Sequence, residues 1–324
     1  TRNGATGTIV NEGRLRASLQ GYIALLAPEV RNQGVIVAEL GTVALAAGET
    51  FTLHFDQHRH LTDLRVEQAA LRTLVENGQA VLAPGGYIIL SSLGLQQVEG
   101  SVVRQNGTLD ASSLVSRGGR ILLEGDAITL GSRSTTAATG ATGGGEVLIG
   151  GGWQGSGTTH QATTVTMAGG ARIDASATKR GGGGTAVLWS NVTRADSSTQ
   201  IAGSITAHGG IEGGQGGRVE TSGHQLQISD SARVSTLAPK DHSGLWLLDP
   251  MDFTIAAGSG AQTTSSIGAD TLSANLDSTN IAIVTDSSTG GNGDISVNAA
   301  VNSSANTLLT LTAHRNINVN AAVS

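Results

Sequence analysis

A short motif that recurs along the chain constrains its fold more than any other feature. It covers five positions: a glycine, a variable residue, a residue that is usually apolar, a second variable residue, and a second residue that is usually apolar. Its copies begin at Gly21, Gly41, Gly86, Gly119, Gly145, Gly184, Gly217 and Gly244. Alternation of apolar and other residues over four or five positions predicts a strand with one buried face. Because strands this short cannot bury that face alone, each copy needs other copies to pack against.

A second motif alternates with the first. It is a glycine or alanine, an aliphatic residue two positions later, and a small residue two positions after that. Its copies begin at Gly13, Gly34, Gly107, Ala171, Gly203 and Ala232, with a looser one at 78–83. One copy is missing before Gly145, where a Ser/Thr/Gly-rich stretch covers 132–144. A third short strand is visible in some repeats, at 127–130, 164–167 and 226–228.

These repeats predict an all-β fold, a three-sided parallel β-helix in which each repeat forms one coil. Stacking would align the first motif in an interior column of Ile23, Val43, Ile88, Ile121 and Val147. The second motif would align Leu15, Ile36, Leu109, Ile173, Ile205 and Val234. About a dozen coils at ~4.8 Å each would make a rod roughly 60 Å long.

The composition suits a narrow interior. The 324 residues include 47 Gly but 3 Trp, 2 Tyr and 3 Phe. Glycine fits coil corners, where the backbone needs positive φ. Collagen is excluded, since glycine has no three-residue period and the chain has 4 Pro. Asn recurs at or just before the corner of the second motif, and a side-chain ladder is expected of Asn11, Asn32, Asn77 and Asn106.

Charge and cysteine content exclude several classes of protein. A net charge of −6 without a basic stripe argues against nucleic-acid binding, which needs clustered cations to neutralise phosphates. The lack of Cys excludes a disulfide framework and thiolate metal sites. No uninterrupted apolar run reaches the ~20 residues that a membrane-spanning helix needs.

Two segments depart from the repeats. Residues 51–66 alternate as two strands joined by a charged tip at 56–60, which predicts a hairpin that projects from the rod. The apolar spacing of 67–75 predicts a short helix after it. From 256 to 324 the glycine-led motifs fade, and the β-helix is expected to continue with a different repeat.

Several strings resemble the filamentous-haemagglutinin-like large exoproteins of two-partner secretion, in the order this family has them. From Asn11 to about Ile255 they include Gly21-Tyr22-Ile23-Ala24-Leu25, Asn32-Gln33-Gly34-Val35-Ile36, Gly41-Thr42-Val43-Ala44-Leu45, Gly150-Gly151-Gly152-Trp153-Gln154-Gly155 and Gly244-Leu245-Trp246-Leu247-Leu248. The resemblance implies a right-handed β-helix, exported through an outer-membrane partner barrel of a Gram-negative bacterium and used as the stalk of an adhesin. Some relatives instead bind haem carriers, act as haemolysins or carry contact-dependent toxins.

The Asn-Pro-Asn motifs of this family's secretion domain do not occur here. Residues 1–55 are therefore expected to be the end of that domain. The hairpin and short helix follow at 56–80, a β-helix stalk at 81–255, and continuing repeats at 256–324. The chain starts without Met and stops inside a repeating pattern, so we expect it to be part of a longer protein whose targeting segment lies elsewhere.

Histidines and a carboxylate gather at the expected hairpin tip, with His54, His58 and His60 near Asp56. Such residues could form a metal site. Neighbouring strand residues alternate faces, however, and the sequence offers no second group of ligands. An exposed polar tip is the favoured interpretation, and we expect no metal and no cofactor.

Asp110 and Asp174 occupy the same position of the second motif, as carboxylates lining the groove of a polysaccharide-degrading β-helix would. In other copies this position is held by Arg16, Val37, Thr206 or Ser235. Such variation suits an outward structural residue better than an acid or base, so no catalytic residue is expected. Among the tryptophans, Trp189 and Trp246 fall inside strand motifs and should pack, whereas Trp153 is the candidate for exposure.

The leading prediction is a secreted, non-enzymatic adhesin or surface-filament stalk that mediates attachment, cell aggregation or biofilm formation. Its expected partners are an outer-membrane two-partner secretion transporter, a glycan or protein receptor on a host or bacterial surface, and further copies side by side or end to end. The alternatives are a β-helix enzyme acting on polysaccharide and a haem-carrier-binding exoprotein. Glycosylation stays open at three sequons, Asn106, Asn191 and Asn302.

Overall fold

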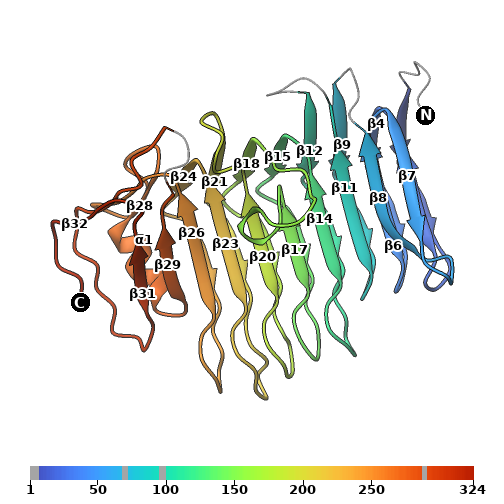
Figure 1. The fold of residues 1–324 in the computed structure, drawn as a ribbon. Helices are drawn as coiled ribbons and strands as arrows, with labels where there is room; N and C mark the ends of the chain where they lie inside the picture. The colour runs from blue at the N-terminus through green and yellow to red at the C-terminus, as the bar shows by residue number, and fades with distance from the viewer. Residues whose placement is uncertain (1–6, 68–71, 95–99, 287–289) are drawn as a thin grey trace.

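The computed structural model describes residues 7–67, 72–94, 100–286 and 290–324. Their strands form three parallel sheets, and most coils contribute one strand to each (Figure 1). The coils stack from the blue N-terminal end to the red C-terminal end (Figure 1). They follow chain order except in one place, where residues 266–268 pair between 225–228 and 253–256. The fold is therefore a three-sided parallel β-helix, and the prediction of fold class is confirmed.

The strands have the following bounds. The 12-stranded sheet contains β1 (Thr8–Asn11), β4 (Glu29–Asn32), β9 (Thr73–Asn77), β12 (Ser101–Gln105), β15 (Ala127–Leu130), β18 (Thr164–Met167), β21 (Ser198–Ile201), β24 (Gln225–Ile228), β28 (Ser266–Gly268), β27 (Phe253–Ala256), β30 (Ile295–Val297) and β32 (Ile317–Val319). The 8-stranded sheet contains β2 (Arg14–Arg16), β5 (Val35–Val37), β10 (Ala80–Leu82), β13 (Thr108–Asp110), β16 (Thr135–Ala137), β19 (Arg172–Asp174), β22 (Ser204–Thr206) and β25 (Arg233–Ser235). The 10-stranded sheet contains β3 (Tyr22–Leu26), β6 (Thr42–Ala47), β11 (Tyr87–Ser92), β14 (Arg120–Glu124), β17 (Glu146–Ile149), β20 (Thr185–Trp189), β23 (Arg218–Gly223), β26 (Leu245–Pro250), β29 (Asn280–Val284) and β31 (Leu309–Thr312).

Equivalent residues of successive coils pair in register, and both predicted interior columns are present. In the 10-stranded sheet the successive partners are Ile23, Val43, Ile88, Ile121 and Val147. In the 8-stranded sheet they are Leu15, Ile36, Val81, Leu109, Thr136, Ile173, Ile205 and Val234. The looser copy of the second motif supplies Val81. The copy that looked missing is β16, which the motif did not reveal because its inward residue is Thr136.

A polar ladder replaces the apolar column at one corner of the first coils. Asn11 donates from Nδ2 to Oδ1 of Asn32, Asn32 donates in the same way to Asn77, and Asn77 donates to Oε1 of Gln105, each at 2.8 Å. The prediction that Asn106 is the fourth member of the ladder is wrong, because the strand register places Gln105 opposite Asn77. Each buried amide thereby satisfies the next, which avoids the cost of an unpaired polar group.

The predicted hairpin is present, formed by β7 (Thr50–Phe55) and β8 (Leu61–Glu67) in antiparallel pairing. The prediction that it projects from the rod is wrong, because its apolar side chains pack on the outward face of the 10-stranded sheet. A short helix was expected at 67–75. Residues 68–71 lie outside the described part of the chain, and the prediction is wrong for 73–75, which form a strand. Thr73 and Val75 belong to β9, where Val75 pairs with Val30 and Val103 in an interior column. Burial in that column decides the conformation over the local helical spacing.

The last coils add strands to the 12-stranded and 10-stranded sheets, whereas the 8-stranded sheet ends and is followed by a helix that the repeats did not indicate. Helix α1 (Ala269–Leu276) lies beside β25, the last strand of the 8-stranded sheet. The Asn275 side chain accepts from the Val234 N–H at 2.6 Å, and Thr279 accepts from the Thr236 N–H at 3.0 Å. These side chains form hydrogen bonds with backbone N–H groups at the edge of the 8-stranded sheet, where another strand would otherwise pair. Among the described residues, no helix has the length and apolar character needed to cross a membrane.

Thr136 provides a test of the interior column. Its hydroxyl is fully buried and has no hydrogen-bond partner among the described residues. Thr136→Val should therefore raise the free energy of unfolding, by about 1 kcal/mol, because it removes an unsatisfied polar group at constant shape. Urea unfolding measures the change.

Thr199 is the matched control, since it is also fully buried in an interior position. Its hydroxyl donates to the carbonyl of Ser222 at 2.7 Å. Thr199→Val should destabilise the fold by about 1 kcal/mol or more. Equal effects of the two substitutions would contradict the assignment of Thr136 to an apolar column.

Candidate functional site

Long loops join the 8-stranded sheet to the 10-stranded sheet in successive coils and stack on one another. They cover 111–119, 138–145, 175–184, 207–217 and 236–244, and we call them the loop ridge. Figure 1 shows them projecting from one side of the rod, below β14, β17, β20, β23 and β26. Stacked loops on a rigid scaffold are where binding residues commonly lie.

Backbone hydrogen bonds between coils continue into the ridge. Gly140 N–H donates to the Ser176 carbonyl at 3.0 Å, Gly209 N–H to Leu237 at 2.9 Å, and Glu212 N–H to Lys179 at 2.7 Å. The ridge is therefore an ordered extension of the β-helix, and side chains at its tips have fixed relative positions.

The glycine run at 181–184 serves this stacking. Gly181 has φ +88, and a Cβ there would lie 2.3 Å from the Thr142 carbonyl oxygen of the preceding coil. Gly183 would meet the Ala207 carbonyl at 2.2 Å. The run thus allows close approach of neighbouring loops.

The ridge exposes aliphatic and cationic side chains together. Leu114 is 89% exposed, Val115 83%, Ile211 64% and Leu237 43%. The two lysines of the whole chain, Lys179 and Lys240, are also on the ridge, with Arg117 and Arg180. Exposed apolar side chains that gather on one surface commonly mark an interaction site. The cations favour a partner with acidic groups.

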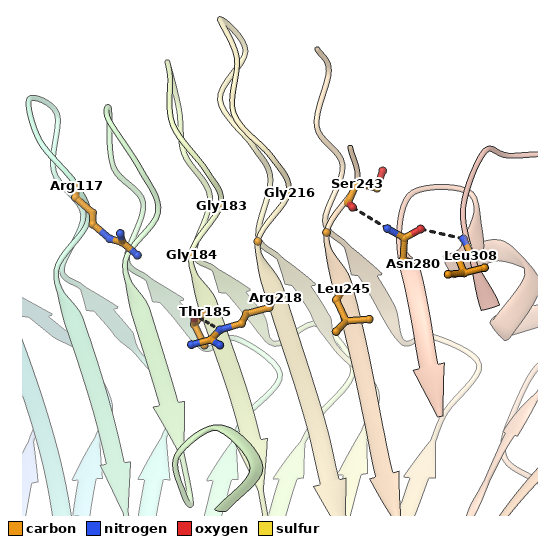
Figure 2. Close-up of a pocket in the computed structure, with 12 residues that line it drawn as sticks. Arg117, Gly183, Gly184, Thr185, Gly216, Arg218, Ser243, Leu245, Asn280 and Leu308 are labelled. Carbon is orange, nitrogen blue, oxygen red and sulfur yellow. Dashed lines mark hydrogen bonds between the residues drawn. The ribbon is translucent and has the colours of Figure 1, made fainter. Parts of the chain in front are cut away.

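An open groove of about 680 Å³ follows the base of the ridge (Figure 2). Its lining consists of Arg117, Gly183, Gly184, Thr185, Gly216, Gly217, Arg218, Ser243, Gly244, Leu245, Asn280 and Leu308. Arg218 donates from Nε to the Thr185 hydroxyl at 3.0 Å, and its guanidinium lies 4.6 Å from the Trp153 ring centroid. With glycines as its floor and guanidinium groups at its sides, the groove can accept an extended acidic segment against backbone.

Asp110 and Asp174 lie where two strands enter the ridge, and they act as turn caps. Asp110 Oδ1 accepts the Ser112 N–H at 2.8 Å, and Asp174 Oδ1 accepts the Ser176 N–H at 2.9 Å. Ala137 stands between them in the register, so they are two coils apart. Two strand spacings are about 10 Å. The structure does not bring them together as an acid–base pair.

A second apolar cluster covers the outward face of the 10-stranded sheet. Its centre is a column in which Ala44, Ile89, Leu122, Leu148 and Val187 are successive partners. The hairpin covers one part of this column. Residues 150–163, which we call the strap, cover another and pass in front of β17 and β20 (Figure 1).

The glycine-rich start of the strap packs on Trp189, which is buried as expected. A Cβ on Gly151 would lie 2.5 Å from the indole, and one on Gly155 would lie 2.7 Å from it. Trp246 is also buried and occupies the interior column, whereas Trp153 is half-buried within the strap. The Gly150–Gly155 string therefore serves close packing of the strap on an aromatic ring.

Carboxylates hold the strap at both ends. Near its start, the Gln154 N–H donates to Glu220 Oε2 at 2.7 Å. Near its end, the His160 N–H donates to Glu124 Oε1 at 2.9 Å, and the His160 ring lies 2.7 Å from Asp126 Oδ1. These anchors sit on β23, on β14 and just after β14, so the strap connects coils that are not neighbours.

Glu220 is the least expected of these anchors. It is fully buried, and burial raises the pKa of its carboxyl to about 7 although Gln154 and Ser222 donate to it. Burial and Asp286 similarly raise the pKa of the neighbouring Asp249 to about 6. Sequence reasoning missed Glu220. The available signal was a glutamate at a motif position that is Ile89, Leu122 or Val187 in other coils.

The stability of the fold should depend on the ionisation of Glu220. Because its pKa in the folded state lies above the ordinary value of 4.5, stability is lost as the pH rises from about 4.5 to about 7. Glu220→Gln keeps an acceptor for the Gln154 N–H and removes the charge. The variant should exceed the free energy of unfolding of the wild type by about 1 kcal/mol at pH 5 and by up to roughly 3 kcal/mol at pH 8.

Chemical unfolding across pH 5–8 measures this difference. Glu212→Gln is the control, since Glu212 is an exposed glutamate of the ridge. It should follow the wild type at every pH. Stability curves of wild type and Glu220→Gln that run parallel would contradict the burial of an ionisable carboxyl under the strap.

The hairpin tip brings Asp56, His58 and His60 together, whereas His54 stays on β7 opposite Asp63. The expectation that no metal site exists rested on alternating strand faces, but Asp56, His58 and His60 are two positions apart, a spacing that alternation keeps on one face.

Of the sequons, Asn302 is exposed, while Asn106 and Asn191 are half-buried.

The structure is similar to the crystal structure of the HMW1 secretion domain from Haemophilus influenzae. The sequences are 26% identical, the match covers 77% of this chain and 68% of that chain, and the TM-score is 0.51. No family model matches the chain, and no curated protein matches it in sequence. The resemblance to the exoproteins of two-partner secretion is confirmed. The similarity extends well beyond residues 1–55, and the predicted domain boundaries remain predictions.

Proposed function

We propose that this chain is part of a secreted, non-enzymatic adhesin or surface-filament stalk that is exported by two-partner secretion. The observation that carries the proposal is the continuous register of parallel coils in a chain similar to the HMW1 secretion domain. A stack of coils is stiff and long relative to its width, so it holds its projecting loops at defined positions along a rod.

Export through an outer-membrane transporter suits the way this fold forms. Each coil pairs with its immediate neighbours, as with β11 between β6 and β14, so a coil can add to those already folded. The chain has no Cys and needs no disulfide to complete a coil. We propose that the chain crosses the transporter unfolded and folds coil by coil outside, with a more N-terminal segment contacting the transporter.

The loop ridge is the proposed contact surface for a receptor. Its exposed Leu114, Val115 and Ile211 can be desolvated by a partner, while Lys179 and Arg180 favour acidic groups. The partner is a glycan or protein of a host or bacterial surface. Contact between ridges of neighbouring molecules would produce cell aggregation and biofilm. Association side by side or end to end is a further proposal of the same kind.

The enzyme alternative lacks geometric support, since Asp110 and Asp174 cap turns and are two coils apart.

A haem-carrier-binding exoprotein would use the same ridge and groove, and retention of a haem carrier from serum would identify it. Glycosylation would fit Asn302 best, because its side chain is exposed.

The experiment uses Gram-negative cells that carry the full-length gene with or without the transporter gene. With the transporter the protein should reach the cell surface or medium, and without it the protein should stay inside. In exporting cells, Leu114→Asp, Val115→Asp and Ile211→Asp combined should reduce attachment or aggregation by about tenfold, because buried charge at the contact opposes binding.

The matched control is Val10→Asp, which charges an aliphatic position on the 12-stranded sheet that is 48% exposed and away from the ridge. This variant should attach like the wild type. Export without the transporter would contradict the proposed secretion route. Normal attachment by an exported ridge variant would contradict the role of the ridge.

A further inference from the structure

The tip of the hairpin is a closed turn that orients three potential ligands. Asp56 N–H donates to the His60 carbonyl, and Arg59 N–H donates to the Asp56 carbonyl, both at 3.0 Å. Arg59 has φ +66, in the left-handed region that residues other than glycine seldom adopt. An extended strand would keep alternate residues about 7 Å apart, and this turn brings His58 and His60 closer to Asp56 than that.

The Asp56 carboxylate is fixed by the backbone of the same turn. Its Oδ1 accepts the N–H groups of His58 at 2.8 Å and His60 at 2.9 Å. Its Oδ2 is thereby directed toward the two rings, 3.0 Å from Nδ1 of His60 and 4.0 Å from Nδ1 of His58. The hydrogen bonds, that from His60 first, hold the pKa of Asp56 below its usual value, so the carboxylate stays ionised.

The imidazoles of His58 and His60 are stacked. Their centroids are 5.8 Å apart and their planes differ by 26°. One ligand atom from each of Asp56, His58 and His60 lies within 4.8 Å of the others. Nitrogen and oxygen bind Zn²⁺ at about 2.0–2.2 Å, which requires ligand atoms about 3–3.5 Å apart. Small rotations of exposed rings would reach that separation.

We propose that the hairpin tip is a binding site for a divalent transition-metal ion of the Zn²⁺ class, with Asp56, His58 and His60 as its ligands. Imidazole and carboxylate ligands suit Zn²⁺, Cu²⁺ and Ni²⁺ rather than Ca²⁺ or Mg²⁺. The site is open, since the side chain of His58 is 66% exposed and that of His60 40% exposed. Water, or a histidine or carboxylate of a partner, can complete the coordination.

The site is independent of the proposed adhesin function, because the tip and the loop ridge are separate parts of the molecule. Arg59 is the cation nearest in sequence to the ligands. Its side chain is exposed, so solvent screens its repulsion of the metal.

Isothermal titration of the purified chain with ZnCl₂, and with CoCl₂ followed by visible absorption, tests the proposal. One ion should bind per chain at pH 7.5. His58→Ala and His60→Ala should each weaken binding by about tenfold or more. Asp56→Asn keeps an oxygen for the two backbone N–H groups, so the turn persists, and it should weaken binding similarly by removing the charged ligand.

His54→Ala is the matched control, because His54 is an exposed histidine of the same hairpin outside the turn. It should bind Zn²⁺ like the wild type. Far-ultraviolet circular dichroism of each variant verifies that the coils are unchanged. No saturable binding by the wild type, equal binding by all four variants, or equal loss in His54→Ala would each overturn the proposal.

Discussion

In-register parallel pairing between successive coils is the constraint on which the rest of the structure depends. The strands of this protein are three to seven residues long, and strands of this length are not stable alone. The backbone hydrogen bonds place each residue directly above its equivalent, so like side chains meet like. Ile121 therefore lies between Ile88 and Val147, and Asn32 lies between Asn11 and Asn77. The same register orders the loop ridge, whose stacked backbones present Leu114 and Ile211 at fixed positions.

Stacking leaves edges and faces that the chain must cover, and the irregular elements do this. Asn275 and Thr279, on and just after α1, satisfy the edge of β25. The hairpin and the strap cover the outward apolar face of the 10-stranded sheet. The buried Glu220 carboxyl accepts a hydrogen bond from the strap. Because burial raises the pKa of this carboxyl, the stability of the fold depends on pH. The features that interrupt the repeats are thus also those that carry charge and chemistry.

The sequence allowed prediction of the coils and both columns, because glycine and aliphatic spacing record local strand geometry. It could not reveal contacts set by register between distant residues. Gln105 replaced Asn106 in the ladder, and Thr136 occupied a column that the motif defines by aliphatic residues. Val75 lies in a strand because it pairs with Val30 and Val103 in an interior column. At the hairpin tip, the turn that contains the left-handed Arg59 brings Asp56, His58 and His60 closer together than an extended strand would.

Disulfide formation between paired positions tests the stacking most directly, since the chain has no Cys of its own. Arg120 and Glu146 are register partners on adjacent coils, about 4.8 Å apart. Arg120→Cys with Glu146→Cys should therefore cross-link on mild oxidation. Tyr87 lies two coils from Glu146, so Tyr87→Cys with Glu146→Cys should stay reduced. Cross-linking of the second pair instead of the first would contradict the register and the β-helix built on it.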